Sequence, residues 1–146
     1  MTRIDFYFNV ADKHQVMTDL VQSALLKRRQ VTIFAEDENM AGEVCADLWQ
    51  NKPESFLPNV LANHALAAQT PVVTHWHEGQ LFQDDILINL TSNEPVFFSR
   101  FTQLVELVSY DEQDKLAARR RYKFYRDRGY EIKNSDHAQT QILAAE

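Results

Sequence analysis

The sequence contains few glycines, and none of them stands where a phosphate-binding loop would need one. Gly42, Gly79 and Gly129 are the only glycines among 146 residues. Loops that hold a nucleotide need glycines between a strand and the next helix, because side chains there keep the backbone amides away from the phosphates. Segment 8–13 occupies that position here and reads Phe-Asn-Val-Ala-Asp-Lys. We therefore expect no nucleotide at this position, and we predict no other cofactor.

Cysteine and long apolar runs are also scarce. Cys45 is the single cysteine, so an internal disulfide cannot form, and the paired spacings of zinc ribbons are missing. No apolar run approaches the roughly 18 to 20 residues that span a bilayer. The first residues lead directly into strand-like sequence and not into a secretory signal. These features predict a cytoplasmic protein with no membrane partner and no structural metal.

Acidic residues outnumber basic ones, but the basic residues are concentrated in one segment. The net charge is −6 and the pI is near 5.3. A protein whose whole surface binds nucleic acid would need cations to meet the phosphates. Segment 115–128 nevertheless has Asp127 as its only acid and contains seven cations, which are Lys115, Arg119, Arg120, Arg121, Lys123, Arg126 and Arg128. The sequence thus predicts an acidic protein that carries one basic helix.

Strand-like and helix-like segments alternate along the chain. The β-prone runs are 4–8, 31–35, 71–76, 85–90 and 102–108, and the segments with helical spacing are 16–25, 37–49 and 111–128. Segment 54–71 is expected to be a loop with one short helical piece. This order predicts an α/β fold with a mostly parallel sheet and helices on both faces, like a Rossmann or P-loop fold that lacks the phosphate-binding loop. We expect residues 1–133 to form this single domain and residues 134–146 to be a polar tail.

Two groups of residues keep an enzymatic alternative open. The acids at 36–38 could serve in acid–base chemistry, although acids in the first turn of a helix are also explained by capping and by the helix dipole. His75 and His77, near the end of a strand, could share a face and hold a metal. We favour the arrangement in which Trp76 faces the core and both histidines face solvent, and we predict no metal site. A small α/β nucleotide-binding or hydrolytic enzyme remains the alternative function.

The basic helix places several charges on one face together with an aromatic ring. Steps of four, three, one and three residues bring side chains onto one helical stripe, which consists of Lys115, Arg119, Tyr122, Lys123 and Arg126. Ala117, Ala118 and Tyr125 lie on the other side, where they can pack on the sheet. Together with Val108 at the end of the preceding strand, the stripe predicts an apolar pocket rimmed by cations. Such a pocket suits a short acidic peptide that ends in a hydrophobic residue. Direct nucleic-acid binding is the alternative, although the net negative charge opposes it.

A series of motifs, in order along nearly the whole chain, resembles the chi subunit family of bacterial DNA polymerase III (HolC). The motifs are Phe6-Tyr7-Phe8, Ala35-Glu36-Asp37-Glu38, Leu48-Trp49, Pro53-Glu54-Ser55-Phe56-Leu57-Pro58, Asp85-Ile86-Leu87-Ile88-Asn89-Leu90 and Lys115-x-x-x-Arg119-x-x-Tyr122-Lys123-x-Tyr125-Arg126. The resemblance implies a fold like that of a nucleotide-binding domain without its nucleotide. It also implies a non-catalytic adaptor of the clamp loader in DNA replication.

The same resemblance implies two binding surfaces. One surface accepts the acidic C-terminal tail of single-stranded-DNA-binding protein, and the family positions for it match Val108, Lys115, Arg119, Tyr122, Lys123 and Arg126. The other surface binds the psi subunit, and its aromatic residues match Trp49 and Phe56. Large aromatic side chains of this kind often dominate the energy of an interface. Any relation to DNA is then indirect, through these two partners.

Overall fold

The chain folds into one seven-stranded sheet with helices packed against it. The computed structural model describes residues 1–50, 59–77 and 81–138. The strands are β1 (Arg3–Val10), β2 (Val31–Phe34), β3 (Asn59–Leu61), β4 (Val72–His75), β5 (Ile86–Asn89), β6 (Gln103–Ser109) and β7 (Ile132–Asp136). The helices are α1 (Lys13–Leu26), α2 (Glu38–Gln50) and α3 (Glu112–Asp127), with short 3-10 turns η1 (Ala67–Gln69) and η2 (Phe98–Arg100). The strand order is β3-β4-β2-β5-β6-β1-β7, and every neighbouring pair is parallel.

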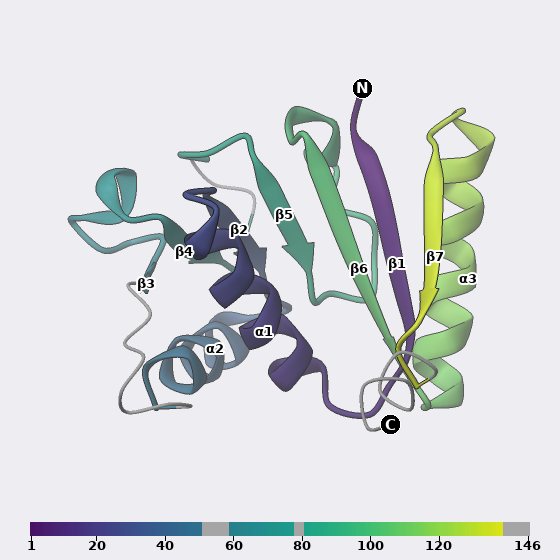
Figure 1. Ribbon diagram of the computed structural model, residues 1–146, viewed down its shortest axis with the longest axis horizontal. Helices are drawn as coiled ribbons and strands as arrows, with labels where there is room; N and C mark the ends of the chain where they lie inside the picture. Colours follow the sequence, from purple (N-terminus) through teal and green to yellow (C-terminus); the bar gives the residue numbers. More distant parts are fainter. Residues whose placement is uncertain (51–58, 78–80, 139–146) are drawn as a thin grey trace.

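The helices cover both faces of the sheet. Alternate side chains of β6 point to opposite faces, so Val105 and Leu107 join one core cluster and Leu104 and Val108 join the other. The first cluster contains apolar residues of α1 and α2, such as Val21 and Val44, and the second contains Ala118 and Tyr125 of α3. In Figure 1, α1 and α2 lie together beside β2 and β4, whereas α3 runs along β1 and β7. The predicted α/β fold with a parallel sheet between helical layers is confirmed.

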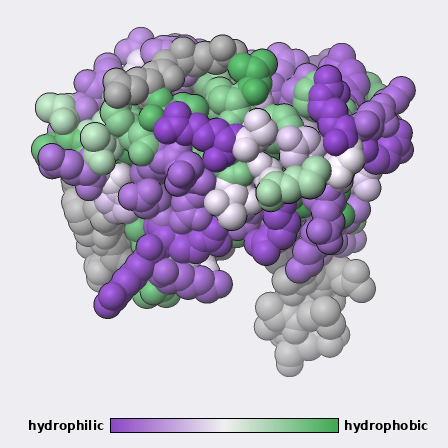
Figure 2. Space-filling model, turned by 90° about the horizontal axis from the view of Figure 1, so that it is seen from above, coloured by the Kyte–Doolittle hydropathy of each residue, from purple (hydrophilic) through white to green (hydrophobic). Residues whose placement is uncertain are grey.

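The burial of the inner strands agrees with helices on both faces of the sheet. All four residues of β4 and all four of β5 are buried, as expected for inner strands of a parallel sheet that is covered on both faces. Hydrophilic residues predominate on the face seen from above in Figure 2, where hydrophobic residues form smaller areas between them. Within the described ranges, no helix is both long and apolar enough to cross a membrane.

Side-chain caps fix the helix ends that the sequence indicated. The carboxylate of Asp111 accepts a hydrogen bond from the backbone N–H of Gln113 at 3.2 Å and begins α3. Gly129, with φ of 82°, ends the helix in the left-handed conformation that favours glycine. Asp37 Oδ1 accepts a hydrogen bond from the backbone N–H of Met40 at 2.8 Å, so this acid caps α2. The capping interpretation of the acids at 36–38 is confirmed for Asp37.

Two short strands at the edges of the sheet were not predicted. β3 lies in segment 54–71, which we expected to be a loop, and it pairs with β4 over only three residues. β7 includes Asn134 and Asp136, which we assigned to the polar tail, so the sheet extends past residue 133. Both segments are short, and β7 has one apolar residue, Ile132, so neither shows a clear strand pattern. An unpaired edge of a neighbouring strand, and not the local sequence, determines that they form strands.

The burial of the histidine pair differs from our prediction. His75 is 1% exposed, whereas Trp76 is half-buried and His77 is exposed. The prediction of outward-facing histidines assumed that one face of the strand is wet, but β4 lies between β3 and β2 and both of its faces are covered. The centroid of the Phe82 ring lies 6.0 Å from the centroid of the His75 ring. His75 and His77 therefore do not present a common surface.

Candidate functional site

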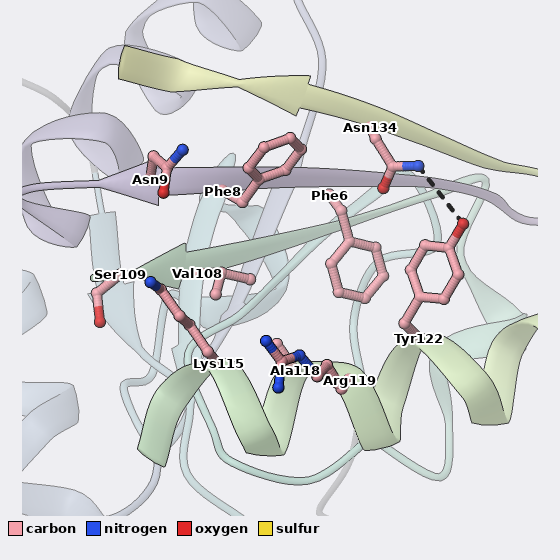
Figure 3. Close-up of a pocket in the computed structure, with 10 residues that line it drawn as sticks. All are labelled: Phe6, Phe8, Asn9, Val108, Ser109, Lys115, Ala118, Arg119, Tyr122 and Asn134. Atoms are coloured by element: carbon pink, nitrogen blue, oxygen red, sulfur yellow. Dashed lines mark hydrogen bonds between the residues drawn. The ribbon is translucent and has the colours of Figure 1, made fainter. Parts of the chain in front are cut away.

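A pocket of about 330 Å³ lies between α3 and the ends of β1 and β6, and we refer to it as the α3 pocket. Four of its residues come from α3, three from β1, two from β6 and one from β7, and they are Phe6, Phe8, Asn9, Val108, Ser109, Lys115, Ala118, Arg119, Tyr122 and Asn134. In Figure 3 the side chains from the helix and those from the sheet face one another across this space. The pocket thus brings together segments from both ends of the chain.

Regular periodicity places most of these side chains. Phe6 and Phe8 are two residues apart on β1, so both point toward α3. Asn9 follows at a register shift in the pairing of β1 with β6, with φ of 59°. On α3, Lys115, Arg119 and Tyr122 are separated by steps of four and three residues, which align them along one side of the helix.

The inner part of the pocket is apolar and closely packed. Val108 is 5% exposed and Phe6 is 4% exposed, so both belong to the core as well as to the pocket. The Tyr122 ring meets the Phe6 ring edge to face, with 5.4 Å between the ring centroids. Asn134 Nδ2 donates a hydrogen bond to Tyr122 Oη at 3.4 Å, which links β7 to the helix (Figure 3). The aromatic wall is therefore held from two strands.

The rim of the pocket is cationic. Lys115 and Arg119 are the charged residues among those that line it, and no acid is among them. Lys115 Nζ lies 3.6 Å from Glu112 Oε1, and the Glu112 side chain is 79% exposed. Arg119 is exposed and forms no hydrogen bond or ion pair with any described residue. An anionic group beside an apolar one would therefore meet complementary surfaces here.

The pocket contains four of the six residues that the sequence grouped together. Val108, Lys115, Arg119 and Tyr122 line it, whereas Lys123 and Arg126 do not. Lys123 is exposed farther along α3. Arg126 is also exposed and lies 3.4 Å from Asp127 Oδ1. The predicted stripe is therefore divided into a pocket and an exposed extension toward the C-terminal end of the helix.

Sequence reasoning missed several lining residues. The spacing of Phe6 and Phe8 on a strand was a usable signal for a shared face, but nothing indicated which helix they would meet. Asn134 carried no such signal, because it reaches the pocket only through the pairing of β7 with β1.

One of the seven cations of the basic segment is not on the surface. Arg121 is 1% exposed, and its guanidinium Nε donates to Glu106 Oε2 on β6. Burial raises the pKa of Glu106 to about 7, while the charge of Arg121 acts in the opposite direction.

The prediction that Ala117, Ala118 and Tyr125 pack toward the sheet is confirmed, since all three are buried.

The residues proposed for the psi surface lie at the limit of what the structure describes. Trp49 is the penultimate residue of α2, and its side chain is not described. Phe56 lies outside the described residues. Their assignment therefore stays a prediction from the sequence.

Comparison with known proteins gives the family. The family model described as DNA polymerase III chi subunit, HolC, matches residues 1–133. The chain is 34% identical to DNA polymerase III subunit chi of Pseudomonas aeruginosa over 138 residues, which are 92% of this chain and 96% of that protein. It is 32% identical to the Escherichia coli subunit chi over 119 residues, covering 81% of each chain.

Solved structures show a similar fold at low sequence identity. The C-terminal domain of the DEAD-box protein Dbp5 matches with a TM-score of 0.65 and 14% identity, covering 94% of this chain and 91% of that domain. This likeness concerns the fold alone. The sequence matches cover between 81% and 96% of the relatives' length at 32% to 34% identity. The chain therefore belongs to the family of DNA polymerase III chi subunits, which are accessory subunits of a replicative polymerase.

Proposed function

We propose that this chain is a non-catalytic adaptor of the clamp loader in the cytoplasm, and that its α3 pocket binds the acidic C-terminal tail of single-stranded-DNA-binding protein. The observation that carries the proposal is the combination of an apolar inner wall with two cations and no acid among the lining residues. An acidic peptide with a hydrophobic terminal residue presents the matching pair of groups.

The chemistry of binding follows from the positions of these groups. The terminal ring of the peptide packs against Tyr122 and Val108, and its carboxylates meet Lys115 and Arg119. Lys123 and Arg126 lie farther along the same helix and attract acidic residues upstream in the peptide. A charge-assisted contact contributes about 1.5 to 3 kcal/mol at best, and exposure to solvent reduces this contribution. Binding is therefore micromolar in scale and weakens as salt is added.

A peptide titration tests the proposal. An acidic peptide that ends in phenylalanine is titrated into the wild type and into Arg119→Ala, with Arg120→Ala as the control. Arg120 is the adjacent exposed cation and does not line the α3 pocket, so its loss makes the same charge change outside the site. We expect the affinity of Arg119→Ala to fall about tenfold and that of Arg120→Ala to fall about twofold or less. Equal affinities for all three proteins would remove the proposed site.

Direct binding of nucleic acid is distinguished in the same assay. If a single-stranded oligonucleotide displaces the peptide at physiological salt, the cations of α3 also bind nucleic acid, and the expectation that any relation to DNA is indirect is wrong. We expect no displacement, because the net charge of −6 repels phosphate over the rest of the surface.

We further propose that the psi subunit binds through Trp49 and Phe56. Both side chains are large anchors of the type that concentrates interface energy, and both belong to the motif shared with the family. Co-purification of psi with the wild type, and its loss with Trp49→Ala and Phe56→Ala, is the expected result. Retention of psi by both variants would contradict this surface.

A further inference from the structure

We propose that the buried Arg121–Glu106 pair is a positioning device, which fixes the rotation of α3 so that the α3 pocket has its shape. The inference rests on the proposed function for its binding test. It also has a test that needs no ligand. Arg121 and Glu106 take no direct part in the pocket, since neither lines it.

The pair joins three separate segments through one guanidinium. Glu106 lies in the middle of β6 and is 0% exposed. Its Oε2 accepts a hydrogen bond from Arg121 Nε of α3. Arg121 Nη1 donates to the backbone carbonyl of Ser92 at 3.0 Å, in the segment that follows β5. The backbone N–H of Ser92 in turn donates to Glu36 Oε2 at 3.0 Å. Hydrogen bonds of fixed direction therefore connect α3 to β6 and to the segment after β5, and Glu36 holds that segment through Ser92.

Stability alone does not account for such a pair. Both ions lose their hydration on burial, and well-packed apolar residues of similar volume are often as stabilising as a buried ion pair or more so. Glu106 Oε1 has no hydrogen-bond partner within bonding distance in the described part of the chain. Arg121, the Asn89 side chain and Lys13 stabilise the carboxylate, but burial outweighs them and the pKa of Glu106 stays raised to about 7, so the desolvation is not fully compensated. In some proteins a buried polar or ionic group with fixed hydrogen-bond directions sets the register between two elements, and this is the role that the proposal gives to Arg121 and Glu106.

The geometry of the helix shows why register matters here. The buried face of α3 consists of Ala117, Ala118, Arg121 and Tyr125. The two alanines on the N-terminal side of Arg121 are small and give little resistance to rotation or sliding, whereas the Tyr125 ring packs one turn beyond Arg121 against Phe6 and Phe98. Successive residues of a helix differ by about 100° in direction. Fixing Arg121 therefore also fixes the direction of its neighbour Tyr122. On the strand, Glu106 and Val108 are two residues apart and point to the same face, so the same bond sets the helix against Val108 in the pocket.

The test uses a double variant that keeps the net charge unchanged. Glu106→Leu with Arg121→Met removes one acid and one cation and leaves an apolar contact in place of the pair. We expect this protein to unfold at a denaturant concentration equal to or above that of the wild type. We also expect the nuclear Overhauser contacts between the Phe6 and Tyr122 rings to weaken in the free protein, and the peptide affinity to fall at least about fivefold. A folded double variant with unchanged ring contacts and unchanged affinity would overturn the proposal.

A conservative variant covers the case in which the double variant does not fold. Arg121→Lys keeps the positive charge opposite Glu106 but replaces the planar fork by a single ammonium group, which cannot hold Glu106 and the Ser92 carbonyl in the same geometry. We expect it to fold and to bind the peptide about two- to fivefold more weakly than the wild type. Wild-type affinity in Arg121→Lys would contradict the positioning role.

The ring contacts separate this inference from the proposed function. If the wild type itself does not bind the peptide, the proposed function fails. The Phe6–Tyr122 contacts of the free double variant still decide the positioning role, since their loss supports it and their persistence overturns it.

Discussion

The Tyr122 ring stands edge to face against the Phe6 ring, with 5.4 Å between the centroids and 63° between the ring planes. Phe6 is 4% exposed, so this contact packs a residue of the α3 pocket against the core. Contacts that hold the Tyr122 ring in place before a ligand binds reduce the conformational entropy lost on binding.

The first prediction concerns the Tyr122 ring. Tyr122→Ala removes the ring on which the peptide packs, and we expect the peptide affinity to fall about five- to tenfold. Tyr122→Phe keeps the ring and loses only the 3.4 Å hydrogen bond with Asn134, so its affinity should stay within about twofold of the wild type. Calorimetric titration of the acidic peptide measures both. Equal losses in the two variants would show that the hydroxyl, and not the ring, makes the contact.

The second prediction concerns Glu112, which competes with the peptide for Lys115 at the rim of the α3 pocket. Glu112 lies 3.6 Å from Lys115 and is largely exposed, so it partly neutralises a cation that the peptide needs. Glu112→Gln should therefore strengthen peptide binding, by about twofold at low salt, and the gain should vanish at high salt. Glu43→Gln makes the same charge change at an exposed position of α2, away from the α3 pocket, and serves as the control. An equal gain in both variants would indicate a general effect of net charge.

The third prediction concerns His75 and pH. Burial, with a smaller effect of His77, lowers the pKa of His75 to about 4, and neither ring nitrogen has a hydrogen-bond partner among the described residues. As pH falls below about 6.5, the unfolded chain binds a proton that the folded chain does not bind, so the free energy of unfolding decreases until the pH nears 4. The loss is about 3 kcal/mol at most.

Urea unfolding of the wild type and of His75→Leu across this pH range checks the expectation. Leucine does not titrate, so the unfolding free energy of His75→Leu should depend less steeply on pH than that of the wild type. Parallel curves for the two proteins would show that His75 takes up its proton in the folded state.

The fourth prediction compares two glycines with opposite backbone requirements. Gly42 is an exposed residue within α2, and a Cβ there would meet nothing within 4 Å, so Gly42→Ala should stabilise the protein by about 0.5 to 1 kcal/mol. Gly129 has φ of 82°, a conformation that alanine rarely adopts. Gly129→Ala should therefore destabilise the protein by about 1 kcal/mol, although an added Cβ would meet nothing within 4 Å. Denaturant midpoints measure both. Shifts in the same direction would contradict the conformational argument.

The limits of sequence-based prediction show most clearly at Arg121 and at β7. Helical spacing placed Lys115, Arg119 and Tyr122 on one stripe, because residues three and four apart on a helix are neighbours wherever the helix packs. The same spacing could not show that Arg121 is buried, since its burial depends on Glu106 of another element lying opposite. β7 was missed because a mostly polar five-residue segment becomes a strand only when a partner edge is available.

Local sequence patterns are enough to predict the α/β alternation, the helix ends at Asp111 and Gly129, and the basic and aromatic stripe of α3. These features depend on hydrophobic periodicity and on local backbone preferences, which act over a few residues. Other features follow from long-range contacts: Lys123 and Arg126 lie outside the α3 pocket, Asn134 from β7 lines it, and His75 is covered. Those outcomes depend on which elements meet in space, because burial and pocket shape come from contacts between residues that are far apart in the chain.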